Sequence, residues 1–224
     1  MAEIYECNTV TEAWEHWYEK LSSMNLTDSS RDGEVCGEII NAITVIEDPT
    51  RNFVLSEKRN LPIRYAIGEL LWYNSRVPTV EAIAPFSSVW ARMSDDGVFV
   101  NSNYGYVIHE KYRFDQYEYC KELLKRDPNT RQAVIHIKTP RNTIEEPTKD
   151  LNCTVCLQLF IRDNKLHMTV YMRSNDIWTG FPYDVFNFTC IQIRMAMELG
   201  VKIGTYTHHA ASLHLYARNL NKEA

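Results

Sequence analysis

The chain has 224 residues, of which 45% are hydrophobic, and this is enough apolar material for one domain with a substantial core. Its formal net charge of −5 argues against general nucleic-acid binding, so a few arginines must hold any bound phosphate. No stretch approaches the roughly 18 consecutive apolar residues of a membrane span, and the N-terminus does not resemble a signal peptide. We therefore expect a single cytoplasmic domain, residues 1–224, that acts on a small anionic ligand.

The first half of the chain contains two predicted helices and one predicted strand. Apolar side chains follow helical spacing over residues 11–24, with Thr11 as a candidate N-cap. Residues 39–46 are rich in β-branched side chains, which favour a strand. Pro62 opens a second helix over residues 62–74, because proline is tolerated at a first helical position.

The second half combines two further helices with a run of strands. The hydrophobic pattern predicts a helix over residues 112–126 and an apolar helix from Pro182 to about Glu198. Between them we expect three strands, at residues 132–138, 153–161 and 166–173. The last two strands are joined through residues 162–165 as a hairpin. This mixture of elements indicates an α+β fold.

Six cysteines are scattered through the chain, and without a secretory signal they are expected to be reduced thiols rather than disulfides. Cys153 and Cys156 form a Cys-x-x-Cys pair, which can belong to a redox or zinc site. A second pair at metal spacing and the helix of a redox motif are both missing. On a strand the two side chains point to opposite faces, so one can line a pocket while the other packs in the core.

Three histidines, His208, His209 and His214, raise the possibility of a metal site. No acidic or cysteine partner lies at a recognisable ligand spacing from them, so the sequence predicts no metal. The aromatic residues near positions 14–18 and 112–119 are interpreted as packing groups.

A series of motifs in fixed order carries the strongest signal. Cys153 is followed five positions later by Gln158, then by the block Arg173-Ser174-Asn175-Asp176, the turn Gly180-Phe181-Pro182 and the pair His214 and Tyr216. The upstream blocks are Glu69-Leu70-Leu71-Trp72, Trp90, Asn103-Tyr104-Gly105 and Pro128-Asn129-Thr130-Arg131. This order resembles the thymidylate synthase family over roughly residues 40–220, and it is far more specific than a single motif.

The resemblance implies a thymidylate synthase-type fold, in which a mixed, bulged β-sheet with flanking helices packs sheet to sheet in a homodimer. It also implies a small nucleotide as substrate and 5,10-methylenetetrahydrofolate as one-carbon donor. No membrane partner and no general nucleic-acid partner are expected.

The resemblance also implies catalytic roles. Cys153 would add as a thiolate to C6 of the pyrimidine, Glu69 would act as general acid/base, and Tyr104 would assist removal of the C5 proton. Arg173 would lower the pKa of the Cys153 thiol, and it would bind phosphate together with Ser174.

The remaining implied roles concern binding. Arg131 would reach the phosphate in the other subunit. The other expected substrate contacts are Gln158, and His214 and Tyr216 at the sugar hydroxyls. The expected folate contacts are Trp90, Asp176 and Gly180.

Within the family, three features are similar to the phage deoxycytidylate hydroxymethylases: the sequence at 101–105, Thr154 after the nucleophile, and Asp184 where the synthases carry asparagine. A carboxyl group at position 184 can accept from the 4-amino group of cytosine and share a proton with N3. Alternatively, Asp184 is only an acid that favours a helix N-terminus.

Other functions remain open at this point. A cytidylate C5-methyltransferase or an ordinary thymidylate synthase would share the early chemistry. A weakly catalytic nucleotide- or RNA-binding relative is suggested by Gln132, which replaces a second arginine, and by the short segment after Tyr216. A hydroxymethylase of phage origin would act in the host cytoplasm.

Overall fold

A computed structural model of the chain describes residues 2–28, 33–138 and 148–220, which form two compact units. The first unit comprises residues 1–61 and 161–224, and the second comprises residues 62–160. The elements of the first unit are β1 (Glu3–Cys7), α1 (Val10–Ser22), β2 (Thr27–Asp28), β3 (Val35–Ile46), β6 (Lys165–Met172), β7 (Asn175–Asp176), α8 (Phe181–Leu199), β8 (Lys202–Tyr216) and a 3₁₀ turn, Ala217–Asn219. The elements of the second unit are α2 (Ile63–Ser75), α3 (Val80–Ile83), α4 (Val89–Met93), α5 (Tyr104–His109), α6 (Gln116–Arg126), β4 (Val134–His136) and β5 (Thr154–Arg162), which runs two residues into the first.

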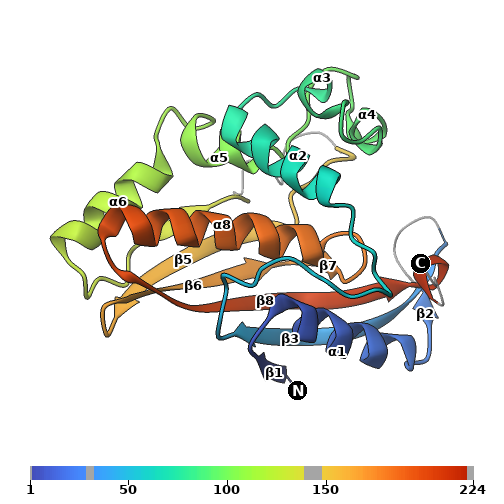
Figure 1. The fold of residues 1–224 in the computed structure, drawn as a ribbon. Coiled ribbons are helices and arrows are strands. Elements are labelled where there is room, and N and C mark those ends of the chain that lie inside the picture. Colours follow the sequence, from blue (N-terminus) through green and yellow to red (C-terminus); the bar gives the residue numbers. More distant parts are fainter. Residues whose placement is uncertain (1, 29–32, 139–147, 221–224) are drawn as a thin grey trace. The chain divides into compact units, whose positions relative to one another are not determined.

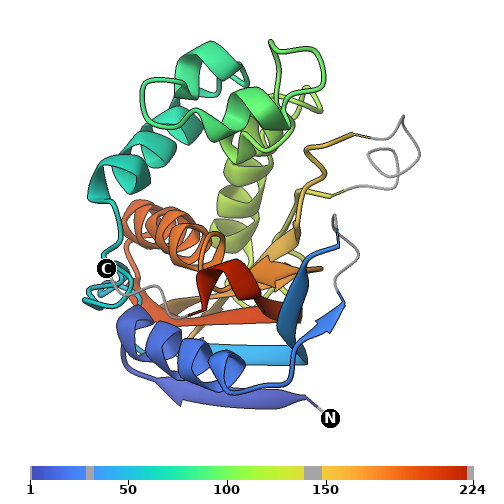
Figure 2. The same cartoon turned by 90° about the vertical axis from the view of Figure 1, so that its right-hand side faces the viewer.

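The first unit is built on a mixed sheet, as the resemblance implied. Strand β3 pairs antiparallel with β8 and parallel with β1. Strand β8 also pairs parallel with β6 and with β7. The register between β6 and β8 shifts between Leu166 and Met168, which marks a bulge. Figure 2 shows β1 beside the N-terminus, at the border of this sheet.

Helices α1 and α8 contact each other and pack on the sheet of the first unit (Figure 1). Two tryptophans anchor α1 in the core. The Trp14 indole donates to the Ile177 carbonyl at 2.9 Å, and the Trp17 indole donates to the Thr44 hydroxyl at 2.8 Å. Both rings are buried, so they contribute apolar area while their N–H groups stay paired.

The ends of the helices correct several expected boundaries. Helix α1 is capped by Thr9 rather than Thr11, because Thr9 and Glu12 form a capping box in which the Glu12 carboxylate also accepts from the Asn8 amide. Pro62 is the N-cap of α2 and not its first helical residue. Asp115 caps α6, so this helix starts four residues later than predicted.

Backbone angles mark two chain reversals, of which the hairpin at residues 162–165 was expected and is confirmed. Gly200 ends α8 with a φ of 68°, a left-handed conformation that suits glycine. Asp163 and Asn164, between β5 and β6, both have positive φ, as a tight two-residue turn requires.

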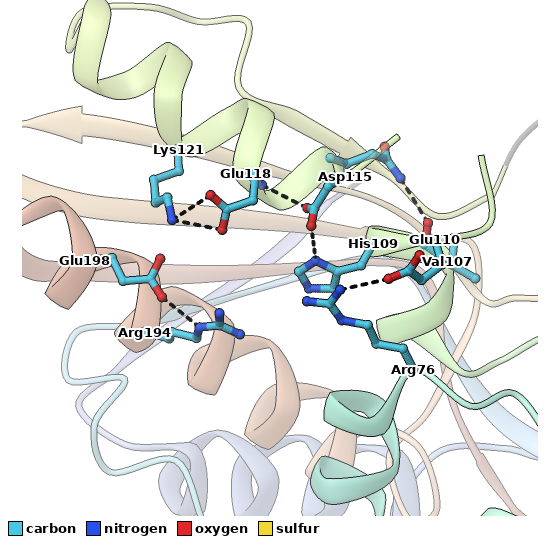
Figure 3. Close-up of polar contacts among 10 residues, drawn as sticks. Arg76, Val107, His109, Glu110, Asp115, Glu118, Lys121, Arg194 and Glu198 are labelled. Atoms are coloured by element: carbon cyan, nitrogen blue, oxygen red, sulfur yellow. Dashed lines mark hydrogen bonds and ion pairs between the residues drawn. The ribbon is translucent and has the colours of Figure 1, made fainter. Parts of the chain in front are cut away.

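In the second unit, α5 packs closely against α2. A Cβ built on Gly105 would lie 1.7 Å from the Tyr73 carbonyl oxygen, so only glycine permits this approach. At the surface, Arg76 after α2 pairs with Glu110 after α5 at 2.8 Å, and the largely buried His109 ring pairs with Asp115 at 2.8 Å (Figure 3). The exposed Arg76–Glu110 pair contributes little, at about 0–1 kcal/mol.

None of the described helices has both the length and the apolar character needed to cross a membrane.

Candidate active site

Asp184 lies in the first turn of α8 and is bonded to a residue that the motifs did not assign a role. The Asn175 amide donates to Asp184 Oδ2 at 2.7 Å. The other oxygen, Oδ1, has no hydrogen-bond partner among the described residues. Asp184 thus presents one satisfied oxygen and one that is open to a ligand.

Burial raises the pKa of the Asp184 carboxyl from 3.8 to about 7, although the Asn175 amide lowers it. Near neutral pH the group therefore divides between its protonated and ionised forms. A carboxyl in this condition can both donate and accept a hydrogen bond.

The raised pKa makes stability depend on pH. Between pH 3.8 and about 7 the folded chain keeps a proton on Asp184 that the unfolded chain releases, so stability falls as pH rises through this window. Asp184→Asn carries no such proton. From pH 4 to pH 8 we expect wild type to lose roughly 2–4 kcal/mol relative to this variant, measured by urea unfolding at each pH. Parallel stability curves would contradict the assigned protonation.

Gly180, expected at the folate site, has a clear steric role beside Asp184. A Cβ at this position would lie 2.9 Å from Asn175 Nδ2 and 3.3 Å from Asp184 Oδ2. Any larger residue would therefore press on the Asn175–Asp184 hydrogen bond. Contact of Gly180 with folate remains a prediction.

Asp176 and His214 lie opposite each other in the pairing of β7 with β8. The Asp176 carboxylate accepts from the Trp178 amide at 2.8 Å and from the Thr179 hydroxyl at 2.5 Å, which fixes its orientation. The His214 ring contacts the Tyr216 ring edge to face, with centroids 4.9 Å apart. The pairing of β7 with β8 thus brings Asp176, an expected folate contact, close to His214 and Tyr216, the two expected sugar contacts.

Arg173 and Ser174 occupy the connection between β6 and β7. Arg173 is exposed and Ser174 is half-buried, immediately before Asn175. Their position on a short connection, next to the residue that holds Asp184, suits a phosphate contact, and this role remains a prediction.

In the second unit, two expected site residues are linked through a third that the motifs missed. The Trp90 indole donates to the Tyr65 hydroxyl at 3.1 Å, and this hydroxyl donates to Glu69 Oε1 at 2.7 Å. Tyr65 and Glu69 are four residues apart on α2, a spacing that places both on one helix face. The sequence shows this spacing, but it does not show that the Tyr65 hydroxyl also accepts from the Trp90 indole.

Tyr104 is buried at the start of α5, and its ring lies 5.4 Å from that of Tyr73. The preceding residue, Asn103, caps the helix by accepting from the Tyr106 amide at 2.8 Å, and it donates to the Trp72 carbonyl at 2.9 Å. These contacts attach the expected proton-transfer residue firmly to α2.

Cys153 immediately precedes β5 rather than lying in it, and its thiol is half-buried, 4.0 Å from the Leu151 carbonyl oxygen. Cys156 lies within β5, where burial raises the pKa of its thiol. None of the six cysteines, each within the described part of the chain, forms a disulfide. A thiol with a raised pKa is a poor nucleophile at neutral pH, so Cys156 is the weaker candidate.

The segment before Cys153 is anchored by Asp150, which sequence reasoning also missed. The buried carboxylate accepts from the backbone amides of Asn101 and Ser102 at 2.6 and 2.8 Å and from the Ser102 hydroxyl. Asn152 donates to the Asn101 carbonyl at 3.2 Å. These bonds hold the approach to Cys153 against the turn that leads into Tyr104.

Gln158 is used by the fold in a way that the motif did not predict. Its amide donates to the Arg131 carbonyl at 2.9 Å. Arg131 itself is exposed, and its guanidinium makes no hydrogen bond or ion pair with the described residues. Gln158 thus holds the backbone of the expected phosphate-binding arginine, and direct contact with the substrate remains a prediction.

The described residues contain no cluster of three or more histidine, cysteine, aspartate or glutamate side chains able to hold a metal ion. His208 and His209 point to opposite faces of β8, and His208 is fully buried.

Comparison with known proteins gives a consistent result. The family model described as thymidylate synthase matches residues 12–223. The deoxyuridylate hydroxymethyltransferase of Bacillus phage SP01 is 33% identical over 200 residues, which are 82% of this chain and 51% of that protein. The deoxycytidylate 5-hydroxymethyltransferase of Enterobacteria phage T4 is 28% identical over 193 residues, covering 81% of this chain and 76% of that protein.

The fold agrees with this. Thermostable thymidylate synthase A from Bacillus subtilis superposes with a TM-score of 0.76 at 20% identity, covering 96% of this chain and 82% of that one. The chain spans about half the length of the SP01 relative. Because the family model spans almost the whole chain and the mixed sheet with flanking helices is the fold that the motifs implied, the chain belongs to the thymidylate synthase family.

Proposed function

We propose that the protein adds a hydroxymethyl group to C5 of a pyrimidine nucleotide and that deoxycytidylate is its preferred substrate. The type of reaction is supported by two relatives, which are both named as hydroxymethyltransferases. Their names differ in the base, uracil in one and cytosine in the other, so the base must be argued from the residues of this chain.

Asp184 is the single observation that carries the choice of cytosine. Cytosine presents an acceptor at N3 and a donor at its 4-amino group, whereas uracil presents a donor at N3 and an acceptor at O4. The Asp184 carboxyl is protonated in part near neutral pH, so it can donate to N3 and accept from the amino group. Deoxyuridylate is the second candidate, favoured by the 33% identity with the SP01 enzyme.

The chemistry would begin at Cys153. Its thiolate sulfur forms a bond to C6 of the ring, and the electron pair displaced from the C5–C6 double bond makes C5 nucleophilic. Partial protonation of Asp184 offsets the negative charge that builds on the ring at this step. Tyr104 assists loss of the C5 proton, and Glu69, oriented by Tyr65, positions water near the ring.

Enzymes of this family take their one-carbon unit from 5,10-methylenetetrahydrofolate. The residues proposed to hold it have suitable chemistry. Asp176 keeps lone pairs free for pterin N–H groups after accepting its two internal bonds, and the half-buried Trp90 ring offers a flat apolar surface. Bound there, the folate would supply the methylene carbon.

The assembly is also a proposal. We propose that the two units act as one catalytic domain, residues 1–224, and that the domain forms a sheet-to-sheet homodimer in which Arg131 serves the phosphate site of the partner. The Arg131 guanidinium is exposed and makes no hydrogen bond or ion pair with the described residues, which supports this role. A location in the cytoplasm, or in the host cytoplasm for a phage protein, remains a prediction.

The mass of the nucleotide product and the state of the folate distinguish the candidate reactions. We expect the protein, deoxycytidylate and methylenetetrahydrofolate to give a nucleotide heavier by one CH₂O unit, about 30 Da, with the folate recovered as tetrahydrofolate; mass spectrometry and folate absorbance measure both. A gain of about 14 Da with dihydrofolate would establish a methyltransferase instead. Turnover of deoxyuridylate alone would assign the second candidate, and no product with any pyrimidine nucleotide would favour a binding relative.

A further inference from the structure

Behind Asp184, three residues continue its hydrogen bond into the core of the first unit. The Tyr206 hydroxyl lies 2.9 Å from His208 Nδ1, and His208 Nε2 lies 3.0 Å from Asn175 Oδ1. Asn175 Nδ2 then donates to Asp184 Oδ2 at 2.7 Å. Tyr206, His208 and Asn175 are all buried, so water does not compete for these bonds.

The direction of each bond is fixed by the chemistry of its neighbours. Because Asn175 uses its NH₂ group toward Asp184, its carbonyl oxygen faces His208 and must receive a donor, which is the Nε2–H group. Burial lowers the pKa of His208 to about 3, so the ring is neutral and Nδ1 is an acceptor. Tyr206 therefore donates to Nδ1. The Phe181 ring packs edge to face against the imidazole at 5.1 Å, which holds it in place.

This direction determines where Asp184 can carry a proton. Asp184 Oδ2 accepts a hydrogen bond from the Asn175 N–H group. A proton on Oδ2 that pointed toward Asn175 would therefore face another donor, which is unfavourable. The proton of the neutral carboxyl is thereby directed to Oδ1, the oxygen without a partner among the described residues. A protonated Oδ1 matches the N3 acceptor of cytosine and opposes the N3–H donor of uracil.

We propose that His208, held by Tyr206 and acting through Asn175, is a positioning residue that directs the Asp184 proton to Oδ1 and so makes the site select cytosine over uracil. The inference rests on the proposed function, because it concerns the base that Asp184 reads. Without the His208 donor, the Asn175 amide is free to turn its oxygen toward Asp184. The proton then moves to Oδ2, and the bare Oδ1 accepts from N3–H of uracil.

The test is a binding measurement that needs no folate. The dissociation constants of deoxycytidylate and deoxyuridylate are measured by calorimetry for wild type and for His208→Leu, and their ratio is compared. We expect the preference for deoxycytidylate to fall by about 10-fold in His208→Leu, because one directed hydrogen bond is lost. His208→Gln restores most of the preference, since the glutamine amide can donate to Asn175. His209→Leu, a change at the neighbouring histidine on the other face of β8, leaves the ratio unchanged.

The outcomes separate the inference from the proposed function. A folded His208→Leu protein with the wild-type ratio overturns the inference alone. Wild-type protein that binds neither nucleotide, or that favours deoxyuridylate, overturns the proposed substrate whatever the variants do. If His208→Leu does not fold, Tyr206→Phe replaces it. Loss of the Tyr206 donor lets Nδ1 carry the proton instead of Nε2, so the ratio falls in the same direction, and an unchanged ratio in this variant overturns the inference.

Discussion

Replacing Cys153 with serine should abolish turnover and leave the fold intact. The hydroxyl group has a far higher pKa than the thiol and does not form a nucleophilic anion at neutral pH, so the bond to C6 cannot form. Removal of a covalent nucleophile lowers kcat by on the order of 10⁴-fold or more. Release of tritium from C5-labelled deoxycytidylate measures the loss, and the circular dichroism spectrum and thermal midpoint should remain those of wild type.

Cys156→Ser is the matched control, since it makes the same atomic change three residues away. Cys156 lies within β5 with a thiol pKa raised by burial, so it is not poised to react. We expect its turnover to stay within a few-fold of wild type. Equal losses in the two variants would contradict the assignment of Cys153 and revive a joint role for the Cys-x-x-Cys pair.

The elements with strong local signals were predictable from the sequence. Helices α1, α2 and α8 have apolar positions at helical spacing, and the sequence located each of them to within a few residues. Strand β8 was missed although it is the longest strand among the described residues and pairs with three others, β3, β6 and β7. Its central residues, 207–212, are threonine, histidine, alanine and serine, and the lack of large apolar side chains there conceals a strand that is paired on both sides. Strand β1 was missed because it is short and Ile4 is exposed.

The site was predictable only where residues belong to an ordered motif. Glu69, Asp184 and Cys153 were selected in this way. Residues that hold them were not. Asp150 and Asn175 act through bonds to turns or side chains that a linear pattern does not connect, and the helical spacing of Tyr65 and Glu69 does not reveal the bond from Trp90 to Tyr65. The link from Asp150 to the amides at 101–102 spans 48 and 49 positions.

The position of Asp150 also explains how a loop residue can serve as the proposed nucleophile. Cys153 lies outside β5, so the strand ladder does not fix its backbone. Three hydrogen bonds to one buried carboxylate replace the ladder at this point, and burial raises the pKa of that carboxyl. Placing a reactive group on a well-anchored loop preserves its geometry, which the proposed attack on C6 needs.

Replacing Asp184 with asparagine should move the preference of the enzyme from cytosine toward uracil nucleotides. The new amide matches uracil when its oxygen takes the Oδ1 position and accepts from N3–H, and its NH₂ group takes the Oδ2 position and donates to O4. Asn175 then turns its own oxygen toward this NH₂ group, which the neutral His208 ring permits by changing tautomer. Cytosine instead meets an acceptor opposite N3 and a donor opposite its 4-amino group. A mismatched buried donor costs ~1–3 kcal/mol, so the ratio of kcat/KM for deoxycytidylate over deoxyuridylate should fall by roughly 10- to 100-fold.

Tritium release from the two C5-labelled nucleotides, measured side by side, gives this ratio directly. Glu198→Gln is the control, because it makes the same carboxylate-to-amide change on α8 at an exposed position paired with Arg194 (Figure 3). This control should keep the wild-type ratio, since it alters the charge of the helix but no group proposed to read the base. An unchanged ratio in Asp184→Asn would show that Asp184 does not distinguish the two bases. Deoxyuridylate would then be as well supported a substrate as deoxycytidylate.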